Sequence, residues 1–322
     1  MTLLATIFLS LFAATPSEAR VLGLVPTIES RGLRLLVSTR SDLWTKPDQD
    51  KDAPVRVYGL DLRIPVLQGE KGAVSAQIHN EALHPAKTGL TVGETPELIG
   101  TNLTSRSIGF GASYQPNENL ETSIFASYES ASDEPFRDIR DKWVEASAIA
   151  AIRVSETRHW VLAVNSSNNR GFRNGELVPY VGVRQMFSPT FEATFGFPFL
   201  FLRWGQTSEL SGTQVTLTPV GVHLESLHQV GENVGIGVNG GLAARSYLNT
   251  NRTDDDTRVI YQETFFEAAG RLQASEGVQI GLVLGGSFNR TMYQARQVFH
   301  PIGSRTTMPS DVYGGFRMEF EL

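Results

Sequence analysis

The chain has 322 residues, a net charge of −6 and no cysteine. The negative charge argues against general nucleic-acid binding, which leaves a basic footprint, and the absence of cysteine excludes disulfides, thiolate metal sites and cysteine nucleophiles. Charged residues make up 19% of the chain, fewer than the roughly 25% usual for a soluble domain. Beyond the N-terminus, no apolar run reaches the roughly 18 residues that a membrane-spanning helix needs.

The N-terminus has the pattern of an export signal. Residues 3–14 are apolar, and Ser17-Glu18-Ala19 forms a small-x-small cleavage pattern before Arg20. The segment before the apolar run lacks Lys and Arg, so a short buried or anchoring helix is the alternative. We expect a cleaved signal peptide at 1–19, followed by a single domain at 20–322, because no Pro/Gly-rich linker divides the rest of the chain.

Alternation with a period of two dominates the chain after the signal. At the C-terminus, Val312, Phe316 and Phe320 share one face of a strand, and Arg317 and Glu319 share the other. Strand geometry sends such sets in opposite directions. The same division into an apolar and a polar face recurs within residues 58–64, 107–114, 120–129, 144–153, 234–245 and 278–289. This pattern predicts strands with one apolar and one polar face.

The lengths of the connections alternate as well, from the first expected strand at 32–40 onward. Long polar loops are expected at 41–53, 80–104, 131–142, 166–176, 249–257 and 294–311, with a medium one at 205–213. Short turns are expected at 68–71, 115–118, 155–157, 188–190, 229–232 and 275–277. Outer-membrane barrels have short periplasmic turns and longer extracellular loops, whereas a soluble β-sandwich, the main rival fold, has no reason to alternate in this way.

The sequence therefore predicts an all-β, antiparallel, up-and-down transmembrane β-barrel with both termini periplasmic. We expect about 14 strands, with 12 to 16 as the range, and the number depends on two prolines. Residues 191–204 are interpreted as one long strand despite Pro198, because the phenylalanines from Phe191 to Phe201 share one parity. Pro219 is interpreted as a β-bulge, because the apolar positions change parity across it.

The polar faces carry charges of both signs, which we expect to line the inside of the barrel. Such a wall suits a pore that sorts small polar solutes, and it equally suits an ion-paired interior that holds the barrel rigid. The candidate lumen-facing charges are Asp61, Arg63, Glu121, Glu145, Arg153, Arg184, Arg245, Glu263, Glu267, Arg271, Arg317 and Glu319, to which Arg34, Glu129 and Glu225 are added by the same parity.

Other chemistry has weaker support in the sequence. Ser127, Ser147 and Ser287 share the polar faces, so a membrane-embedded hydrolase is conceivable, but nothing brings a histidine to any of them. The run 254–256, three aspartates, could bind calcium, although a solvated loop tip is the better interpretation. We expect no catalytic residue, no metal and no cofactor. An aromatic girdle is expected from the tryptophans near strand ends, which are Trp44, Trp143, Trp160 and Trp204.

Two segments carry a resemblance to known proteins. Residues 179–198, PYVGVRQMFSPTFEATFGFP, resemble the core hairpin of an uncharacterised family of bacterial outer-membrane β-barrels, catalogued as a domain of unknown function. The C-terminal VYGGFRMEFEL is similar to the signal by which the barrel assembly machinery recognises its substrates, with Leu322 in place of the usual final Phe. The resemblance implies a location and a fold, and it implies no activity.

These observations lead to three functional hypotheses. The first is a porin-like channel or transporter for small solutes or hydrophobic compounds in the cell outer membrane of a Gram-negative bacterium, with outer-membrane lipid and the barrel assembly machinery as partners. The second is a non-conducting barrel that presents its extracellular loops, such as 80–104, to other molecules. The third is the hydrolase. A soluble secreted β-protein is the alternative to all three.

Overall fold

The computed structural model describes residues 33–43, 54–85, 91–92, 97–98, 102–168, 175–197, 199–208, 210–218, 221–250, 252–297 and 300–321. The expected signal peptide at 1–19 and Trp44 lie outside these residues. Within the described ranges, no helix has the length and apolar character needed to cross a membrane.

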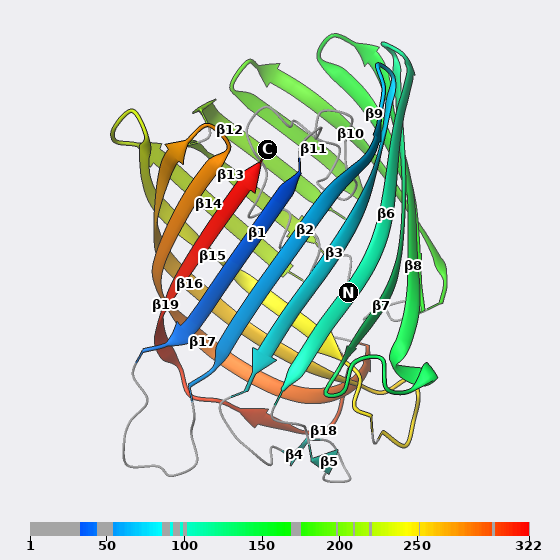
Figure 1. Cartoon of the computed structure of the whole chain (residues 1–322), viewed down its shortest axis with the longest axis vertical. Coiled ribbons are helices and arrows are strands. Elements are labelled where there is room, and N and C mark those ends of the chain that lie inside the picture. Colours follow the sequence, from blue (N-terminus) through cyan, green and yellow to red (C-terminus); the bar gives the residue numbers. More distant parts are fainter. Residues whose placement is uncertain are drawn as a thin grey trace.

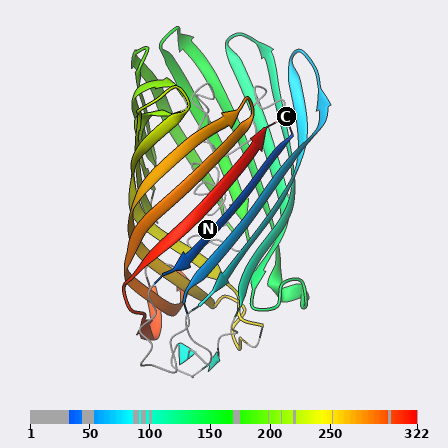
Figure 2. The same cartoon turned by 60° about the vertical axis from the view of Figure 1, so that its left-hand side comes forward.

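Seventeen strands form one antiparallel sheet, and sixteen of them close into a barrel (Figures 1 and 2). Closure follows because β1 pairs with β19 on one side and with β2 on the other. In the first half of the chain, the barrel strands are β1 (Arg34–Asp42), β2 (Arg56–Gln68), β3 (Gly72–His84), β6 (Leu103–Asn117), β7 (Leu120–Ser132), β8 (Lys142–Ser155) and β9 (Arg158–Ser167). In the second half, they are β10 (Leu177–Ser188), β11 (Phe191–Phe197), β12 (Leu200–Ser208), β13 (Ser211–Thr218), β14 (Gly221–Gln229), β15 (Val234–Tyr247), β16 (Arg258–Ser275), β17 (Val278–Gln297) and β19 (Asp311–Glu321).

The two ends of the barrel differ in their connections, as the alternation of short turns and long loops predicts. The short turns lie at the end where Arg34 of β1 faces Glu321 of β19, so the described chain begins and finishes at this short-turn end. The opposite, long-loop end holds β18 (His300–Thr307), which pairs with the outer part of β17, and the small β4 (Thr91–Val92) and β5 (Glu97–Leu98) pair (Figure 1). The expected loops at 80–104 and 294–311 are therefore shorter than predicted, because β3 and β17 continue to His84 and Gln297.

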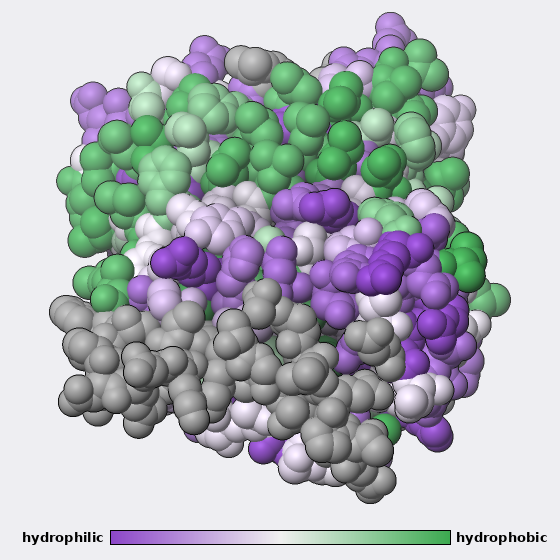
Figure 3. All heavy atoms as spheres, turned by 60° about the horizontal axis from the view of Figure 1, so that its bottom comes forward, coloured by the Kyte–Doolittle hydropathy of each residue, from purple (hydrophilic) through white to green (hydrophobic). Residues whose placement is uncertain are grey.

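The outer face of the wall carries an apolar belt, and the alternation along each strand is the cause. Exposed members of the belt are Ile64, Ile78, Ile108, Phe110, Ile124, Val144, Ile152, Leu162, Val181, Phe195, Leu217, Leu224, Ile236, Phe266, Leu282 and Leu284. Toward the long-loop end the outward positions become polar, as at Asn80 on β3, Arg106 on β6 and Lys142 on β8. In Figure 3, apolar residues cover the wall and hydrophilic residues gather toward the long-loop end.

The barrel has sixteen strands rather than about 14, because two predicted strands are each a pair of strands. The first is the segment 191–204. Gly196 and Phe199 exchange both backbone hydrogen bonds, at 3.0 and 3.1 Å, so the chain reverses between them and Phe195 pairs with Leu200. Pro198 itself lies outside the described residues, but a proline cannot donate to a strand ladder, and the predicted single strand is wrong.

The second division lies at Pro219, which is also outside the described residues. Thr218 pairs with Gly221, and Leu217 pairs with Val222. Cross-strand partners of such a tight hairpin have opposite parity while sharing one face. The parity change that we interpreted as a bulge is therefore the signature of a hairpin. Because both segments divide, the later loops and turns keep their expected ends, but the connections from β11 to β12 and from β13 to β14 are short connections at the long-loop end, so connection length does not alternate there. The medium loop at 205–213 becomes a tight turn at the short-turn end between Ser208 and Ser211.

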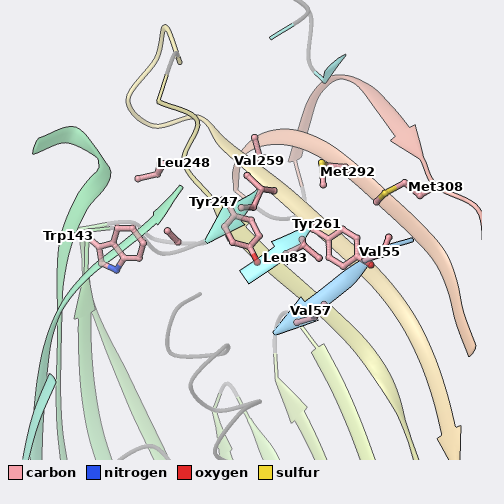
Figure 4. Packing of buried hydrophobic residues seen from close by; sticks show 12 residues of the cluster. Val55, Val57, Leu83, Trp143, Tyr247, Leu248, Val259, Tyr261, Met292 and Met308 are labelled. Atoms are coloured by element: carbon pink, nitrogen blue, oxygen red, sulfur yellow. The ribbon is translucent and has the colours of Figure 1, made fainter. Parts of the chain in front are cut away.

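A cluster of twelve buried hydrophobic side chains lies inside the barrel at its long-loop end (Figure 4). We call this cluster the apolar plug. Its side chains come from the ends of β2, β3, β6, β7, β8, β15, β16 and β17 and from the loops beside them, and each is less than one tenth exposed. The members are Val55, Val57, Leu83, Leu103, Ala131, Trp143, Tyr247, Leu248, Val259, Tyr261, Met292 and Met308. Trp143 was expected in an aromatic girdle; it points inward because it shares its parity with Glu145.

Candidate functional site: the polar interior of the barrel

Glu263 is the centre of a polar network inside the barrel. Arg40 donates to both carboxylate oxygens of Glu263, at 2.8 and 2.6 Å, and Arg245 donates to Glu263 at 3.3 Å and to Glu81 at 2.8 Å. The hydroxyl of Tyr261 also donates to Glu263, at 2.9 Å. These residues come from β1, β3, β15 and β16, so the network joins strands that are far apart in the sequence.

The network continues around the same sector of the wall. Glu267 accepts hydrogen bonds from the Tyr313 hydroxyl at 2.8 Å and from Asn239 at 2.9 Å. The guanidinium carbon of Arg40 lies 3.7 Å from the centroid of the Tyr313 ring, which is within the range of a cation–π contact. A polar interior built this way keeps its charges paired, because an isolated buried charge is costly.

Nearer the short-turn end, arginines and glutamates of the same strand, or of strands one or two apart, pair along the inner face. Arg34 lies 2.6 Å from Glu319, and Arg317 lies 3.1 Å from the second oxygen of that carboxylate. Arg271 pairs with Glu225, and Arg63 lies 3.7 Å from Glu321. On the other side of the barrel, Glu192 binds both Arg184 at 2.8 Å and Arg203 at 3.2 Å.

A second sector, on β7 and β8, is acidic. Glu129 accepts a hydrogen bond from Ser127, and Glu145 accepts one from Asn165 at 3.0 Å. Register places Glu145 opposite Ser127 and Glu129 opposite Trp143, so the two carboxylates belong to adjacent rows of neighbouring strands. Across the described residues, no lysine or arginine forms an ion pair with Glu129. We call Glu129 and Glu145 the acidic patch.

A cavity of about 180 Å³ lies against the arginine-rich sector. Its lining includes Arg40, Glu81, Arg245, Glu263 and Phe265. Both charged and apolar side chains therefore face the same cavity, which has room for several water molecules.

All twelve candidate lumen charges lie on the inner faces of their strands, opposite the belt. Ten of them have the partners given above or, for Asp61, a contact of 2.6 Å with Nδ1 of His79. Glu121 and Arg153 lie on the same inner faces of β7 and β8. The structure thus distributes the candidates around the wall instead of gathering them at one point.

Several members of these networks were not predicted from the sequence. Arg40 shares its parity with Arg34, and Glu192 lies on the inner face of β11, so parity alone could have identified both. Arg290 could not be found that way. It is buried and binds Asp42 through two hydrogen bonds of 2.8 and 2.5 Å, although the inner face of β17 has odd numbers up to Ser287. A register shift between Gln262 and Thr264 and the positive φ of Asn289, 49°, turn it inward.

The serines considered for a hydrolase are bound to other groups. Ser127 donates to Glu129, Ser147 accepts from Asn165 at 2.8 Å, and Ser287 donates to Glu263. Within the described chain, no hydrogen bond joins any of the three to a histidine. The nucleophile–base contact that such chemistry requires is therefore not formed by the described residues.

The aspartate run 254–256 lies outside the belt, and its charges pair with arginines. Asp254 accepts hydrogen bonds from Arg296 at 3.0 and 2.6 Å and from the backbone N–H of Asp256 at 2.9 Å. The Asp256 N–H and the Arg296 guanidinium together hold the pKa of Asp254 below its ordinary value. Searching the described residues finds no group of His, Asp or Glu side chains arranged to hold a metal ion.

The exposed aromatics form a partial girdle at the short-turn end. Trp160 and Trp204 lie on the outer face with Tyr114, Phe187 and Phe191, all more than one third exposed. Phe187 and Phe191 stack at 5.0 Å between ring centroids, across the short turn that follows β10. Aromatic residues are favoured at the interface between hydrocarbon and water, so these positions mark one edge of the belt.

No family model matches the chain, and no curated protein matches it. Among solved structures, an outer-membrane channel from Pseudomonas putida F1 is similar, with 10% identity over 92% of this chain and 97% of that one and a TM-score of 0.39. The toluene transporter TodX of P. putida is similar at 9% identity, over 90% and 89%, with a TM-score of 0.33. LpxR of Salmonella typhimurium is similar at 10% identity, over 90% and 100%, with a TM-score of 0.31.

Proposed function

We propose that this protein is an outer-membrane, porin-like channel through which small polar solutes and ions diffuse, and that it has no catalytic role. The carrying observation is the inversion of polarity across a closed wall: hydrophobic side chains are exposed on the outside and ion-paired side chains line the inside. A soluble barrel would need the reverse. A closed barrel also pairs the backbone N–H and C=O groups of its first and last strands. Lipid requires this pairing, because it offers unpaired backbone groups no water to bind.

Several expectations from the sequence belong to this proposal. They are the Gram-negative outer membrane as location, the cleaved signal, the periplasmic position of the short-turn end, insertion by the barrel assembly machinery, and membership of the uncharacterised barrel family. The likeness of residues 179–198 to a family hairpin supports the last of these, since β10 and β11 form a tight hairpin over that segment.

The interior chemistry favours polar solutes over apolar ones. Inward positions carry arginines, glutamates, serines and asparagines, and the apolar groups between them form small separate clusters, such as Ile149 with Val161. Fixed charges of both signs on different sectors create a field across the lumen, which orients and sorts small solutes.

Purified protein refolded into a planar bilayer in potassium chloride tests the proposal. We expect discrete conductance steps from a preparation whose electrophoretic mobility changes on boiling, as closed barrels do. Protein that shows the mobility change but no conductance, and whose liposomes do not swell in L-arabinose, would overturn the channel.

The apolar plug favours a second candidate, a non-conducting barrel that presents its long loops. Twelve buried side chains pack together inside the barrel near that mouth. The same bilayer measurement decides between the two, because this second candidate predicts no conductance from well-folded protein.

A further inference from the structure

The wall of the barrel is not equally high all round. Strands β11 to β14 have 7, 9, 8 and 9 residues, whereas β15, β16 and β17 have 14, 18 and 20. At about 3.3 Å per residue and a tilt of roughly 40°, the four short strands rise by only about 18 to 23 Å. That is no more than the apolar belt of about 25 Å usual for outer-membrane barrels. We call β11 to β14 the low wall.

Strand pairing shows that the two strands beside the low wall, β10 and β15, extend beyond its upper edge, which we call the rim. The pairing of β10 with β11 ends at Val181–Phe197, four residues after β10 begins at Leu177. The pairing of β14 with β15 ends at Val222–Leu242, although β15 runs on to Tyr247. On both sides, the taller strands rise past the rim of the low wall.

The tall strands are joined to one another at the long-loop end. The backbone N–H of Leu248, just after β15, donates to the Ala131 carbonyl near the end of β7 at 2.7 Å. Thr250 donates to Asp133 through its N–H at 2.9 Å and its hydroxyl at 2.8 Å. Seven barrel strands, β8 to β14, separate β7 from β15 in the sheet, so this contact bypasses them.

A buried ion pair strengthens the same junction. Arg252 lies 2.5 Å from Asp141 of the loop before β8, and it also donates to the Arg140 carbonyl at 2.6 Å. Both side chains of the pair are at most 1% exposed. The mouth at this end is thus a smaller ring of nine strands, β15, β16, β17, β19, β1, β2, β3, β6 and β7, and the apolar plug lies within that ring.

The cavity inside the barrel reaches above the height at which the pairing of the low wall with β15 ends. Its lining includes Ala243, Ala244 and Arg245, which belong to the part of β15 above the β14 pairing. Arg245 there is bound to Glu81 and Glu263, so charged groups lie directly behind the rim.

We infer that small polar solutes reach the lumen sideways, over the low wall at the level of the outer edge of the belt, and not along the axis through the plugged ring. This inference rests on the proposed channel function and specifies its path. Because the low wall rises no higher than the belt usual for such barrels, a solute crossing its rim at Phe197 and Thr218 passes from the layer of lipid headgroups and water into the polar interior. The plug and the ring junction then have a structural role, which is to hold the tall strands together over a wide interior.

The absence of cysteine from the chain allows single attachment sites. Phe197→Cys places a thiol at the low rim, where the side chain is 78% exposed. Arg106→Cys is the matched control, because Arg106 is also exposed and faces outward past the belt, but on the tall side. Each variant is treated with biotin maleimide and then streptavidin, and swelling of proteoliposomes in L-arabinose is measured. We expect streptavidin to slow swelling by about ten-fold for the first variant and by less than about two-fold for the second, because only the first obstructs the path.

A second variant tests the axial route independently. Ser132 and Leu248 are bridge partners, whose spacing suits a disulfide, so Ser132→Cys with Leu248→Cys locks the ring when oxidised. We expect the same swelling rate before and after oxidation.

Loss of swelling on oxidation, or equal inhibition by streptavidin at Phe197→Cys and Arg106→Cys, would overturn the side path while leaving the channel intact. Absence of swelling in the unmodified, heat-modifiable protein would overturn the channel and the side path together. If Phe197→Cys does not fold, Thr218→Cys on the same rim replaces it under the same expectations.

Discussion

Glu263 illustrates how single residues hold this interior together. It accepts from Arg40, Arg245, Tyr261 and Ser287 and is 1% exposed. Glu263→Ala leaves two buried guanidinium groups without this partner, and removing one member of a buried pair costs about 3–5 kcal/mol. We therefore expect Glu263→Ala to lower the free energy of unfolding by that amount, measured by urea unfolding in the presence of lipid vesicles.

Glu321→Ala is the matched control for that measurement. The Glu321 side chain is 33% exposed and lies 3.7 Å from Arg63. A partly exposed pair of this kind contributes about 0–1 kcal/mol. Equal losses for the two substitutions would show that the Glu263 network does not stabilise the barrel.

The acidic patch makes a prediction about ion preference. Glu129 and Glu145 are inward-facing carboxylates on neighbouring strands, and carboxylates lining a pore attract cations. We expect a cation-preferring channel, and we expect Glu129→Gln with Glu145→Gln to lower the ratio of potassium to chloride permeability by about two-fold or more. Reversal potentials in a gradient of potassium chloride measure the ratio.

Ser123→Gln serves as the comparison for the double variant, since it alters an inward residue of β7 without changing charge. An unchanged permeability ratio in the double variant would place the ion path away from β7 and β8.

At the scale of elements, the hairpin of β11 and β12 depends on the absence of a side chain at Gly196. A Cβ at this position would lie 2.5 Å from Cζ of Phe199, whose ring covers the inner surface of Gly196 and Gly182. Gly196→Val therefore overpacks the hairpin, at a cost of about 1–3 kcal/mol. We expect the double variant Gly196→Val with Phe199→Ala to recover part of the lost free energy of unfolding, because the effects of substitutions at contacting residues are coupled. Urea unfolding of the single and double variants measures this coupling.

This hairpin also shows what the sequence could and could not predict. Alternation and connection length predicted closure, the end that holds the termini, and the inward charges on long strands such as β15 and β16. They failed where strands are short. A run of phenylalanines from Phe191 to Phe201 has one parity whether it continues or turns, and only cross-strand pairing shows that Phe195 faces outward while Phe201 faces inward.

The inner networks were out of reach for a related reason. Parity tells which face a residue occupies, but not which strand ends meet across the barrel. Arg252 and Asp141 are 111 positions apart, and their buried pair exists because the loops after β7 and β15 meet at the long-loop end. The apolar plug forms for the same reason, because strand ends that are far apart in the sequence meet inside the closed barrel. The sequence did not show this meeting, and Trp143 was therefore expected on the outer girdle.

For the whole molecule, the decisive property is whether hydrocarbon or water surrounds the wall. Leu282 lies in the middle of the belt on β17 and is 62% exposed. In lipid, an arginine near the bilayer midplane costs about 2–4 kcal/mol. We therefore expect Leu282→Arg to lower the free energy of folding into phospholipid vesicles by that amount.

Thr264→Arg is the matched control, because Thr264 faces outward on the adjacent β16 and pairs with Phe288 near the edge of the belt. There the cost of an arginine falls to about 0–1 kcal/mol. In a soluble β-protein both sites would be ordinary surface, where substitutions change stability by no more than about 0.5 kcal/mol. A difference between the two variants thus requires a wall whose surroundings change with height, whereas equal and small effects would mean that water surrounds the barrel.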